Sequence, residues 1–308
     1  MLERSAIPSV RIRTLGDPSV RARGEYVLYW MTAFRRHDYN CSLERAVEWA
    51  QQLGKPLVVL EALRVGYRGA SDRLHRFVMD GMADNAAALS GTGIGYWPYV
   101  EPERGAGKGL LKALSEQACL VVTDELHGFF QPRMVAAAAE QLSVRLETVD
   151  GAGLLPVRAA ERAWPTAYAF RRHLHRSLRE HLTTRPLPDP LESGAPPAFD
   201  GLPDPVRERW PATTVEQLTS GADATLAGLP IDHDVLVTSE RGGARAARAA
   251  LERFLATGLP RYADDRNQPE QDVASGLSPW LHFGHISTHE VFDALARRED
   301  WSPDRLAD

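Results

Sequence analysis

The sequence predicts an α/β protein: an N-terminal doubly wound parallel sheet, then a long linker and the start of an all-helical domain. Five apolar segments alternate with amphipathic segments through residues 25–150, which is typical of a parallel sheet with helices on both faces. Residues 183–235 are rich in proline, glycine and threonine, and they are too long for an ordinary loop inside a compact domain. Residues 241–308 carry apolar side chains at helical spacing.

The elements of the N-terminal part follow from hydrophobic periodicity. The expected strands are residues 25–31, 56–62, 94–99, 119–123 and 144–149. The expected helices are residues 43–53, 71–89, 110–116 and 132–142, with Ser71 as the N-cap of the second. Ligands of such sheets bind at the carboxyl ends of the strands. This rule places a site near residues 31–38, 62–70 and 124–130.

Four helices are expected after residue 150. The expected helices are a basic one at 166–182, a short one near 214–220, one at 241–258 stopped by Gly258, and one at 288–298. We therefore expect four parts: a 1–24 N-terminal extension, a 25–150 α/β domain, a 151–240 basic helix and linker, and a 241–308 partial helical domain.

Composition indicates a soluble globular protein with ample material for a core, since 44% of the 308 residues are hydrophobic and 25% are charged. The net charge of −5 weakly disfavours nucleic acid, although arginines cluster in two places. Two cysteines fit a reducing compartment. No apolar run reaches the ~18 residues of a membrane span, and no signal peptide is evident. We expect a cytoplasmic monomer.

Neither a phosphate-binding P-loop nor a metal site is favoured by the sequence. Gly105-Ala-Gly-Lys-Gly109 lacks the glycine and the Ser/Thr that a phosphate-binding P-loop needs, so a flexible turn is favoured. Scattered acids and histidines lack the spacing of a metal site; they are His37, Asp38, Asp72, His75 and His127. Asp124-Glu125 follows a strand end, where either a site carboxylate or a helix N-cap is consistent with the pattern.

A basic stretch and a Ser/Gly-rich turn are the better candidates. Arginines recur at helical spacing from Arg171 and Arg172 to Arg179; such a face binds DNA phosphates or is simply solvated. Arg241, Arg245 and Arg248 form a second basic face, which likewise either binds DNA phosphates or is simply solvated. The turn from Ala274 through Ser275, Gly276, Leu277 and Ser278 offers hydroxyls and close backbone approach before a helix. It predicts either a phosphate site or an ordinary capping loop.

Two long motifs near the C-terminus resemble those of a known family. Tyr262-Ala-Asp-Asp-Arg-Asn-Gln-Pro269 and Leu277-Ser-Pro-Trp-Leu-His-Phe-Gly-His-Ile-Ser287 are similar to a signature of class II cyclobutane pyrimidine dimer photolyases, within the DNA photolyase/cryptochrome family. Tyr26-Val-Leu-Tyr-Trp-Met31 with Arg35-Arg36-His-Asp-Tyr-Asn40 is similar to the first strand and loop of the antenna domain of that family. The likeness covers nearly the whole chain.

The resemblance implies a deoxyribodipyrimidine photo-lyase, a carbon-carbon lyase in which reduced FAD passes an electron under light to a flipped-out dimer in ultraviolet-damaged DNA. It implies FAD contacts from Tyr262, Ala274, Ser275, Gly276, Leu277 and Ser278. It implies an antenna chromophore of deazaflavin or folate type in the N-terminal domain. Arg266 would meet DNA or flavin, and Arg171 and Arg172 would meet DNA. No metal is expected.

The resemblance also carries two departures. Ala274 stands where relatives outside class II carry threonine, which removes one hydroxyl from the turn. Relatives continue well beyond position 308, so we expect a C-terminally truncated chain whose catalytic residues lie beyond Asp308. Neither Trp280 nor Trp301 is assigned to an electron relay.

Two alternatives remain. One is a non-catalytic, cryptochrome-like protein that binds flavin or DNA. The other is an α/β nucleotide-binding enzyme, which Met31-Thr-Ala-Phe-Arg-Arg36 disfavours because it lacks a glycine-rich phosphate turn after the first strand.

Overall fold

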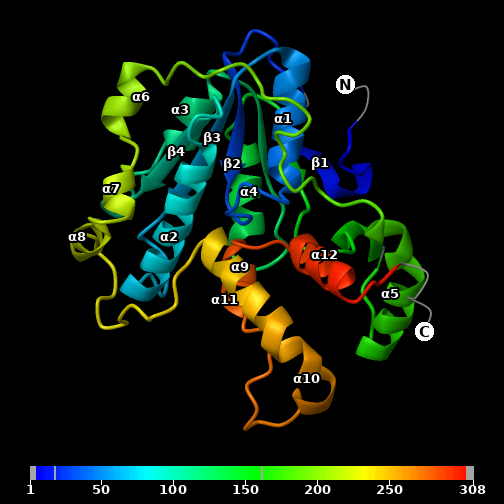
Figure 1. Cartoon of the computed structure of the whole chain (residues 1–308). Coiled ribbons are helices and arrows are strands. Elements are labelled where there is room, and N and C mark those ends of the chain that lie inside the picture. Colours follow the sequence, from blue (N-terminus) through cyan, green and yellow to red (C-terminus); the bar gives the residue numbers. More distant parts are fainter. Residues whose placement is uncertain (1–4, 17–18, 161, 303–308) are drawn as a thin grey trace.

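A six-stranded sheet forms the centre of the computed structural model, which describes residues 5–16, 19–160 and 162–302. The strands are β1 (Ile12–Leu15), β2 (Tyr26–Met31), β3 (Leu57–Leu63), β4 (Gly95–Val100), β5 (Ala118–Asp124) and β6 (Leu146–Val149). Their order is β1-β6-β5-β2-β3-β4 (Figure 1). The strands from β2 onward pair in parallel. The predicted doubly wound parallel sheet is confirmed, and its strand order reverses between β2 and β5.

The edge strand β1 was not predicted. It lies inside the segment expected as an N-terminal extension and pairs antiparallel with β6, Ile12 opposite Val149 and Leu15 opposite Leu146. Its four residues are half-buried or exposed, without a clean alternation. A short, partly exposed edge strand leaves little periodicity in a sequence. Residues 1–4 and 17–18 of the expected extension lie outside the described residues.

Two pairs of helices cover the two faces of the sheet, as the predicted periodicity requires. The helices are α1 (Cys41–Leu53), α2 (Asp72–Leu89), α3 (Leu110–Ser115) and α4 (Gln131–Ala139). On one face, Tyr29 and Met31 pack with Leu43 and Trp49 of α1. On the other face, alternate residues of β2 pack with α3 and α4. Because β2 is buried along its whole length, its sequence is a continuous apolar run rather than an alternating one.

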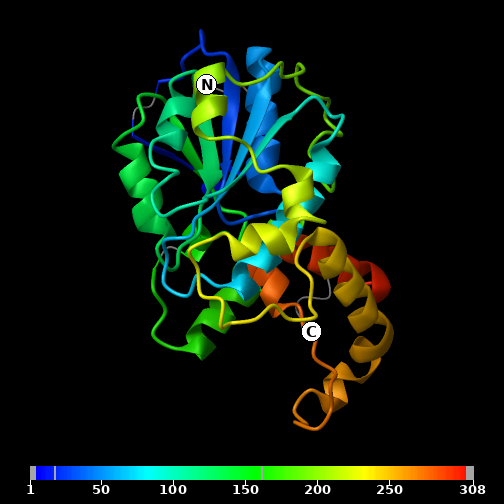
Figure 2. The ribbon, with the colours of Figure 1, turned by 90° about the vertical axis from the view of Figure 1, so that its left-hand side faces the viewer.

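The connector after the predicted basic helix α5 (Ala167–Leu182) runs past α1, over the top of the sheet and down beside α2 (Figures 1 and 2). It carries three short helices, α6 (Asp204–Arg209), α7 (Val215–Leu218) and α8 (Ala222–Ala227). The predicted helix near 214–220 is confirmed as α7, which begins with a capping box at Thr214. The helices α6 and α8 were not predicted. Buried Trp210 and Leu218 attach the connector to the sheet and to α2.

The regular elements of the C-terminal part are all helices among its described residues. It contains α9 (Ala244–Arg253), a π-helical turn (Phe254–Gly258), α10 (Leu259–Asp265), α11 (Ser278–Phe283) and α12 (Thr288–Arg298). The expectation that Gly258 stops the helix is wrong, because the helix continues into α10. A Cβ atom at Gly258 would lie 2.7 Å from the Phe254 ring, so close packing is the reason for glycine there. Residues 303–308 lie outside the described residues.

The helical part is attached at the carboxyl ends of the strands, where the loop after β2 meets the end of α11 (Figure 1). Arg36 is buried and donates to the carbonyl oxygen of Gly284 at 2.9 Å. Gly284 has a φ of 72°, and a Cβ atom there would lie 1.9 Å from the carbonyl oxygen of Ala33. The position therefore requires glycine for two reasons, conformation and contact.

We predict that Gly284→Ala destabilises the protein more than Gly54→Ala does. Gly54 ends α1 with a φ of 60° and has open space around its Cβ position, so its substitution costs only the left-handed strain of about 1–2 kcal/mol. Gly284→Ala adds the overlap with Ala33, a further ~1–3 kcal/mol. Urea unfolding of both variants measures the difference. Equal losses would contradict the contact described here.

Candidate functional site

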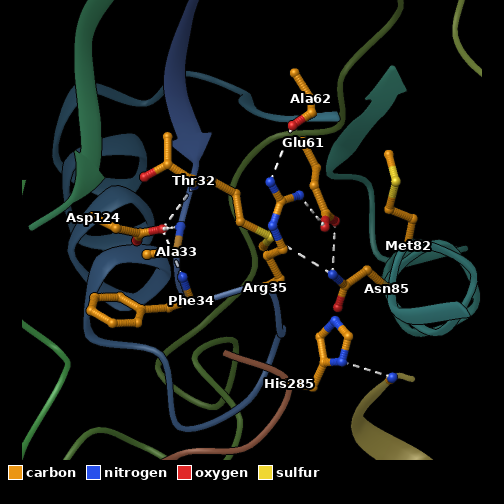
Figure 3. Close-up of polar contacts among 12 residues, drawn as sticks. Thr32, Ala33, Phe34, Arg35, Glu61, Ala62, Met82, Asn85, Asp124 and His285 are labelled. Atoms are coloured by element: carbon orange, nitrogen blue, oxygen red, sulfur yellow. Dashed lines mark hydrogen bonds and ion pairs between the residues drawn. The ribbon is translucent and has the colours of Figure 1, made fainter. Parts of the chain in front are cut away.

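The carboxylate of Asp124 organises the crevice between β2 and β5. Its Oδ2 accepts hydrogen bonds from three successive backbone N–H groups, those of Thr32, Ala33 and Phe34, at 2.8, 2.7 and 2.9 Å (Figure 3). Its Oδ1 accepts from the hydroxyl of Tyr29 at 2.7 Å. Burial, reinforced by this carboxylate, raises the pKa of Tyr29 well above its ordinary value. Successive N–H groups of this kind form an anion-binding concavity, and here an internal carboxylate fills it.

Of the two alternatives for Asp124-Glu125, the helix N-cap is wrong, because α4 begins only at Gln131. Glu125 instead pairs with Arg13 at 3.2 Å and with Arg158. Asp124 is fully buried and supports the loop after β2. Both carboxylates thus hold neighbouring segments of the protein together.

Glu61 is a second saturated carboxylate at the same edge, in β3. It accepts from Arg35 at 3.0 Å and from Asn85 at 2.9 Å (Figure 3). It also accepts from the hydroxyl of Tyr96 at 2.6 Å. Arg35 also donates to the carbonyl oxygen of Ala62. Since Glu61 is fully buried, these three donors supply the pairing that a buried charge requires.

Glu101, like Asp124, accepts hydrogen bonds from backbone N–H groups, here those of the glycine-rich turn. Its Oε1 accepts from the backbone N–H groups of Gly105 and Gly107 at 2.9 and 3.1 Å, and its Oε2 accepts from that of Val65 at 3.1 Å. The turn favoured over a P-loop is confirmed, because its N–H groups already bind a carboxylate. The alternative of a nucleotide-binding enzyme is disfavoured, because the backbone N–H groups after β2 and those of this turn bind Asp124 and Glu101 instead of a ligand phosphate.

His285 follows α11 and is buried against α2. Its ring stacks on Phe77 with centroids 5.1 Å apart, and its Nδ1 accepts from the backbone N–H of Gly243 at 2.9 Å. The proton of the neutral ring therefore lies on Nε2. Burial, with Arg35 and Arg36 nearby, lowers the pKa of His285 to about 3. Burial and the proximity of Arg11 likewise lower the pKa of His289 to about 3.

The residues expected to contact flavin lie together at the far end of the helical part. Tyr262 is on α10, 36% exposed, with its ring edge-on to Phe254 at 5.8 Å. Phe254 shares an apolar cluster with Leu277, so the loop carrying the predicted turn returns beside this helix. Ser275 Oγ accepts from the N–H of Leu277 at 3.4 Å.

The rest of the turn is open. Ala274, Gly276 and Ser278 are exposed, and a Cβ atom at Gly276, which has a φ of 66°, would meet nothing within 4 Å. Open backbone beside exposed hydroxyls fits contact with a phosphate. Two cavities of about 440 and 250 Å³ are found elsewhere in the described part of the chain.

The arginines expected to bind DNA occupy two places. Arg171 and Arg172 are exposed on α5, a helix without a buried residue. Arg266 lies at the end of α10, its guanidinium 5.6 Å from the centre of the Tyr262 ring. Figure 1 shows α5 and α10 as separate parts of the ribbon, so the structure does not gather the three residues into one cluster.

Arg241, just before α9, and Arg245 and Arg248 within α9 form ion pairs. Arg245 pairs with Asp84 at 2.6 Å, Arg241 with Asp80 at 3.9 Å, and Arg248 with Glu290 at 2.6 Å. Their carboxylates come from α2 and α12, so this face connects the helical part to its neighbours. The side chains of Arg241 and Arg245 are 57% and 73% exposed, so this face is also solvated, and its contact with DNA stays a prediction.

His75 and the two cysteines lie in the interior of the protein. His75 is buried and contacts the carbonyl oxygens of Ser71 and Arg64. Among the described residues, no group of three or more His, Cys, Asp or Glu has the arrangement of a metal site. Cys41 and Cys119 are both buried and free. None of the described helices combines the length and the apolar character that crossing a membrane requires.

Sequence reasoning missed the roles of Glu61, Glu101 and His285. A signal was available for the first, because a lone glutamate inside the apolar run Leu57–Leu63 is costly unless it is paired. His285 accepts from the backbone N–H of Gly243, which is distant in sequence, so no local pattern identifies its role. Glu101 accepts from Gly105 and Gly107 of the adjacent turn and from the distant Val65.

Relatives of known name match nearly the whole chain. A deoxyribodipyrimidine photo-lyase of Methanothermobacter thermautotrophicus is 31% identical over 287 residues, which are 91% of this chain and 58% of that protein. The chain belongs to the photolyase/cryptochrome family. A photolyase-family relative from Potorous tridactylus, also a deoxyribodipyrimidine photo-lyase, is 24% identical over 96% of this chain and 53% of its own length. This photolyase-family chain thus spans little more than half the length of these relatives.

The fold agrees with that membership. The crystal structure of a bacterial class III photolyase from Agrobacterium tumefaciens aligns with a TM-score of 0.62 and 19% identity, covering 92% of this chain and 56% of that one. No model of a protein family matches the chain. The family assignment made from the motifs is confirmed, and the narrower assignment to class II stays a prediction.

We predict that Asp124→Ala destabilises the protein far more than Asp264→Ala, which alters an exposed residue of α10. Removing the carboxylate of Asp124 leaves three buried N–H groups without their acceptor, and each orphaned donor costs about 1–3 kcal/mol. Asp124→Asn, which keeps one acceptor oxygen, should fall between the two. Urea denaturation ranks the variants; a loss in Asp124→Ala no larger than that in Asp264→Ala would refute this role.

We predict that stability falls as pH drops below about 6.5, partly through His285. Its folded pKa of about 3 lies below its ordinary value, so from pH 6.5 to 3 the unfolded chain binds a proton that the folded chain does not. Stability is therefore complete above 6.5 and declines by up to about 1.4 kcal/mol per pH unit toward 3. His285→Asn keeps an acceptor for the Gly243 N–H but cannot be protonated. Its pH dependence, followed by thermal unfolding, should be shallower, and an unchanged slope would count against this assignment.

Proposed function

We propose that this chain serves light-dependent repair of ultraviolet-induced cyclobutane pyrimidine dimers in DNA, the activity of a deoxyribodipyrimidine photo-lyase. The observation that supports it is the 31% identity to a protein of that name along 91% of the chain. The proposed activity is a carbon-carbon lyase reaction, and we expect the protein to work as a monomer in the cytoplasm. Because the chain spans only 58% of that relative, the site of chemistry need not lie within it.

The proposed cofactor is FAD. When bound and reduced, FAD supplies an electron to the dimer under light. Within this chain, Gly276 and Ser278 would face the phosphates, with Ala274, Ser275 and Leu277 shaping the turn. Tyr262 would contact the cofactor from α10. The exposed hydroxyls and open backbone of the turn support this assignment. An antenna chromophore of deazaflavin or folate type is proposed for the N-terminal domain; the backbone N–H groups of the loop after β2 already bind Asp124.

Ultraviolet-damaged DNA is the proposed partner. The positive charges of Arg171, Arg172 and Arg266 would neutralise its phosphates, which makes binding fall steeply with salt. Arg171 and Arg172 are exposed on a helix whose described cations greatly outnumber its acids. That charge supports phosphate contact without any reading of bases.

We predict light-dependent repair when this chain is joined to the segment by which the Methanothermobacter relative extends beyond it. The chimera should retain flavin and remove dimers under blue light but not in darkness. This chain alone should retain little flavin and remove none, because the turn supplies only part of a binding site. Dimer loss in irradiated DNA, measured with the relative itself as positive control, decides it. Flavin retention without repair would favour the non-catalytic, cryptochrome-like alternative.

Substitutions in the chimera test the assigned residues. Gly276→Asp should weaken flavin retention at least tenfold through repulsion of the phosphates, whereas Gly276→Asn, matched in shape and equally tolerant of a positive φ, should weaken it less. Arg171→Glu with Arg172→Glu should weaken DNA binding and flatten its salt dependence while leaving flavin retention intact. Equal effects of Gly276→Asp and Gly276→Asn would remove the turn from the phosphate site.

A further inference from the structure

A cavity of about 440 Å³ lies where α1, the end of α2, the connector, α9 and α12 meet. It is separate from the turn at 274–278 and from Tyr262, neither of which lines it. Small-molecule sites in proteins have volumes of about 300–1,000 Å³. The cavity therefore has the size of a binding site, and no role proposed above uses it.

One side of this cavity is apolar. Leu43 of α1 and Leu89 of α2 line it and are buried, and Leu191 of the connector faces them. Ala88, half-buried on the last turn of α2, contributes a small side chain to the same lining. Apolar walls of this kind hold the body of an organic molecule rather than a hydrated ion.

The residues on the other side carry buried polar atoms without partners in the described part of the chain. The side chain of Asp38 is only 8% exposed, and its Oδ2 is paired with Arg248. Its Oδ1 is buried and has no hydrogen-bond partner among the described residues. The same holds for Nδ1 of His37, and both residues line the cavity. A buried carboxylate oxygen without a donor is costly, so this pair indicates a place for hydrogen-bond donors.

The charge of the lining is negative. Asp38, Asp189 and Glu290 supply three carboxylates, and Arg248 is the one lysine or arginine among the lining residues. Arg248 is already shared between Asp38 and Glu290. Burial and the proximity of Arg248 lower the pKa of His37, so its ring is uncharged at neutral pH. The balance favours a cation and disfavours an anion.

Tyr39, also in the lining, has a φ of 44°. A left-handed conformation in a bulky residue costs about 1–2 kcal/mol. The conformation is held by Arg36, which donates to the Tyr39 carbonyl at 3.1 Å, and by the Tyr39 hydroxyl, which donates to Asp293 at 3.2 Å. Strain of this kind concentrates at ligand sites, and here it is adjacent to Asp38.

We propose that this cavity binds a small planar organic cation of the amidinium or guanidinium type. Its N–H groups would donate to Asp38 Oδ1 and His37 Nδ1, and its body would lie against Leu43, Leu89 and Leu191. A bare metal ion fits less well, because the lining acids and histidine do not form a metal-binding group within the described residues. The site involves neither flavin nor DNA, so it stands independently of the proposed repair activity.

Benzamidine is the probe, with benzoate and benzyl alcohol as anionic and neutral molecules of similar shape. Calorimetric titration of the chain in the dark should give one benzamidine site, at least tenfold tighter than either comparator. Equal affinity for benzoate would overturn the assignment of charge. Absence of benzamidine binding at millimolar concentration would overturn the proposal.

Variants locate the site. Ala88→Phe should fill the cavity and reduce benzamidine affinity at least tenfold, while Ala87→Phe, on an exposed neighbouring position of α2 outside the lining, should leave it unchanged. Asp38→Asn, which keeps the shape but removes the charge, should also lose at least tenfold. Circular dichroism of each variant confirms folding; if Ala88→Phe unfolds, Asp38→Asn decides. Wild-type affinity in folded Asp38→Asn or Ala88→Phe would place the probe elsewhere and refute the inference.

Discussion

The carboxylate of Asp124 is the interaction on which the arrangement of this photolyase-family chain depends. It ends β5 and binds three successive N–H groups of the loop that leaves β2. That loop carries Arg36, which binds Gly284, and Asn40, whose side chain caps α1. One buried charge therefore determines where α1 begins and where the helical part attaches. Because its donors are backbone groups, it acts independently of the side chains of the loop.

Glu101 likewise accepts hydrogen bonds from backbone N–H groups in the turn between β4 and α3. Two anion-binding backbone concavities at the sheet edge are therefore occupied by carboxylates of the protein itself. In doubly wound sheets the carboxyl edge is the usual place for a ligand phosphate. Here the same backbone geometry is used to hold the protein together. The sheet becomes a rigid support, and the open, phosphate-compatible backbone lies instead at Gly276, on the helical part.

The sequence predicted the sheet, its helices and the helical part because these depend on periodicity, which is a local property. It failed where long-range contacts decide. The edge strand β1 is recognisable only through its pairing with β6, and Gly258 resembles a helix stop until Phe254 is seen to occupy the space beside it. The ion pairs of Arg241 and Arg245 were not predicted, since their partners Asp80 and Asp84 lie far away in the sequence, on α2. For the candidate site, motif likeness identified the family, and its assignment of the turn at 274–278 stays a prediction, whereas Asp38 with its unpaired oxygen carries no sequence signal.

The same dependence on distant contacts links the two candidate binding places. Arg248 joins Asp38 of the β2 loop to Glu290 of α12, and His285 joins α11 to the start of α9 through the N–H of Gly243. The ion pairs of Arg248 connect the β2 loop to the helical part, whereas the hydrogen bond of His285 lies within the helical part, whose contact with α2 includes the stacking of His285 on Phe77. A molecule that donates to Oδ1 of Asp38 shares this carboxylate with Arg248, which pairs with Oδ2. The cavity and the turn at 274–278 are connected through α9, because Arg248 lines the cavity and Leu251 of the same helix shares an apolar cluster with Leu277.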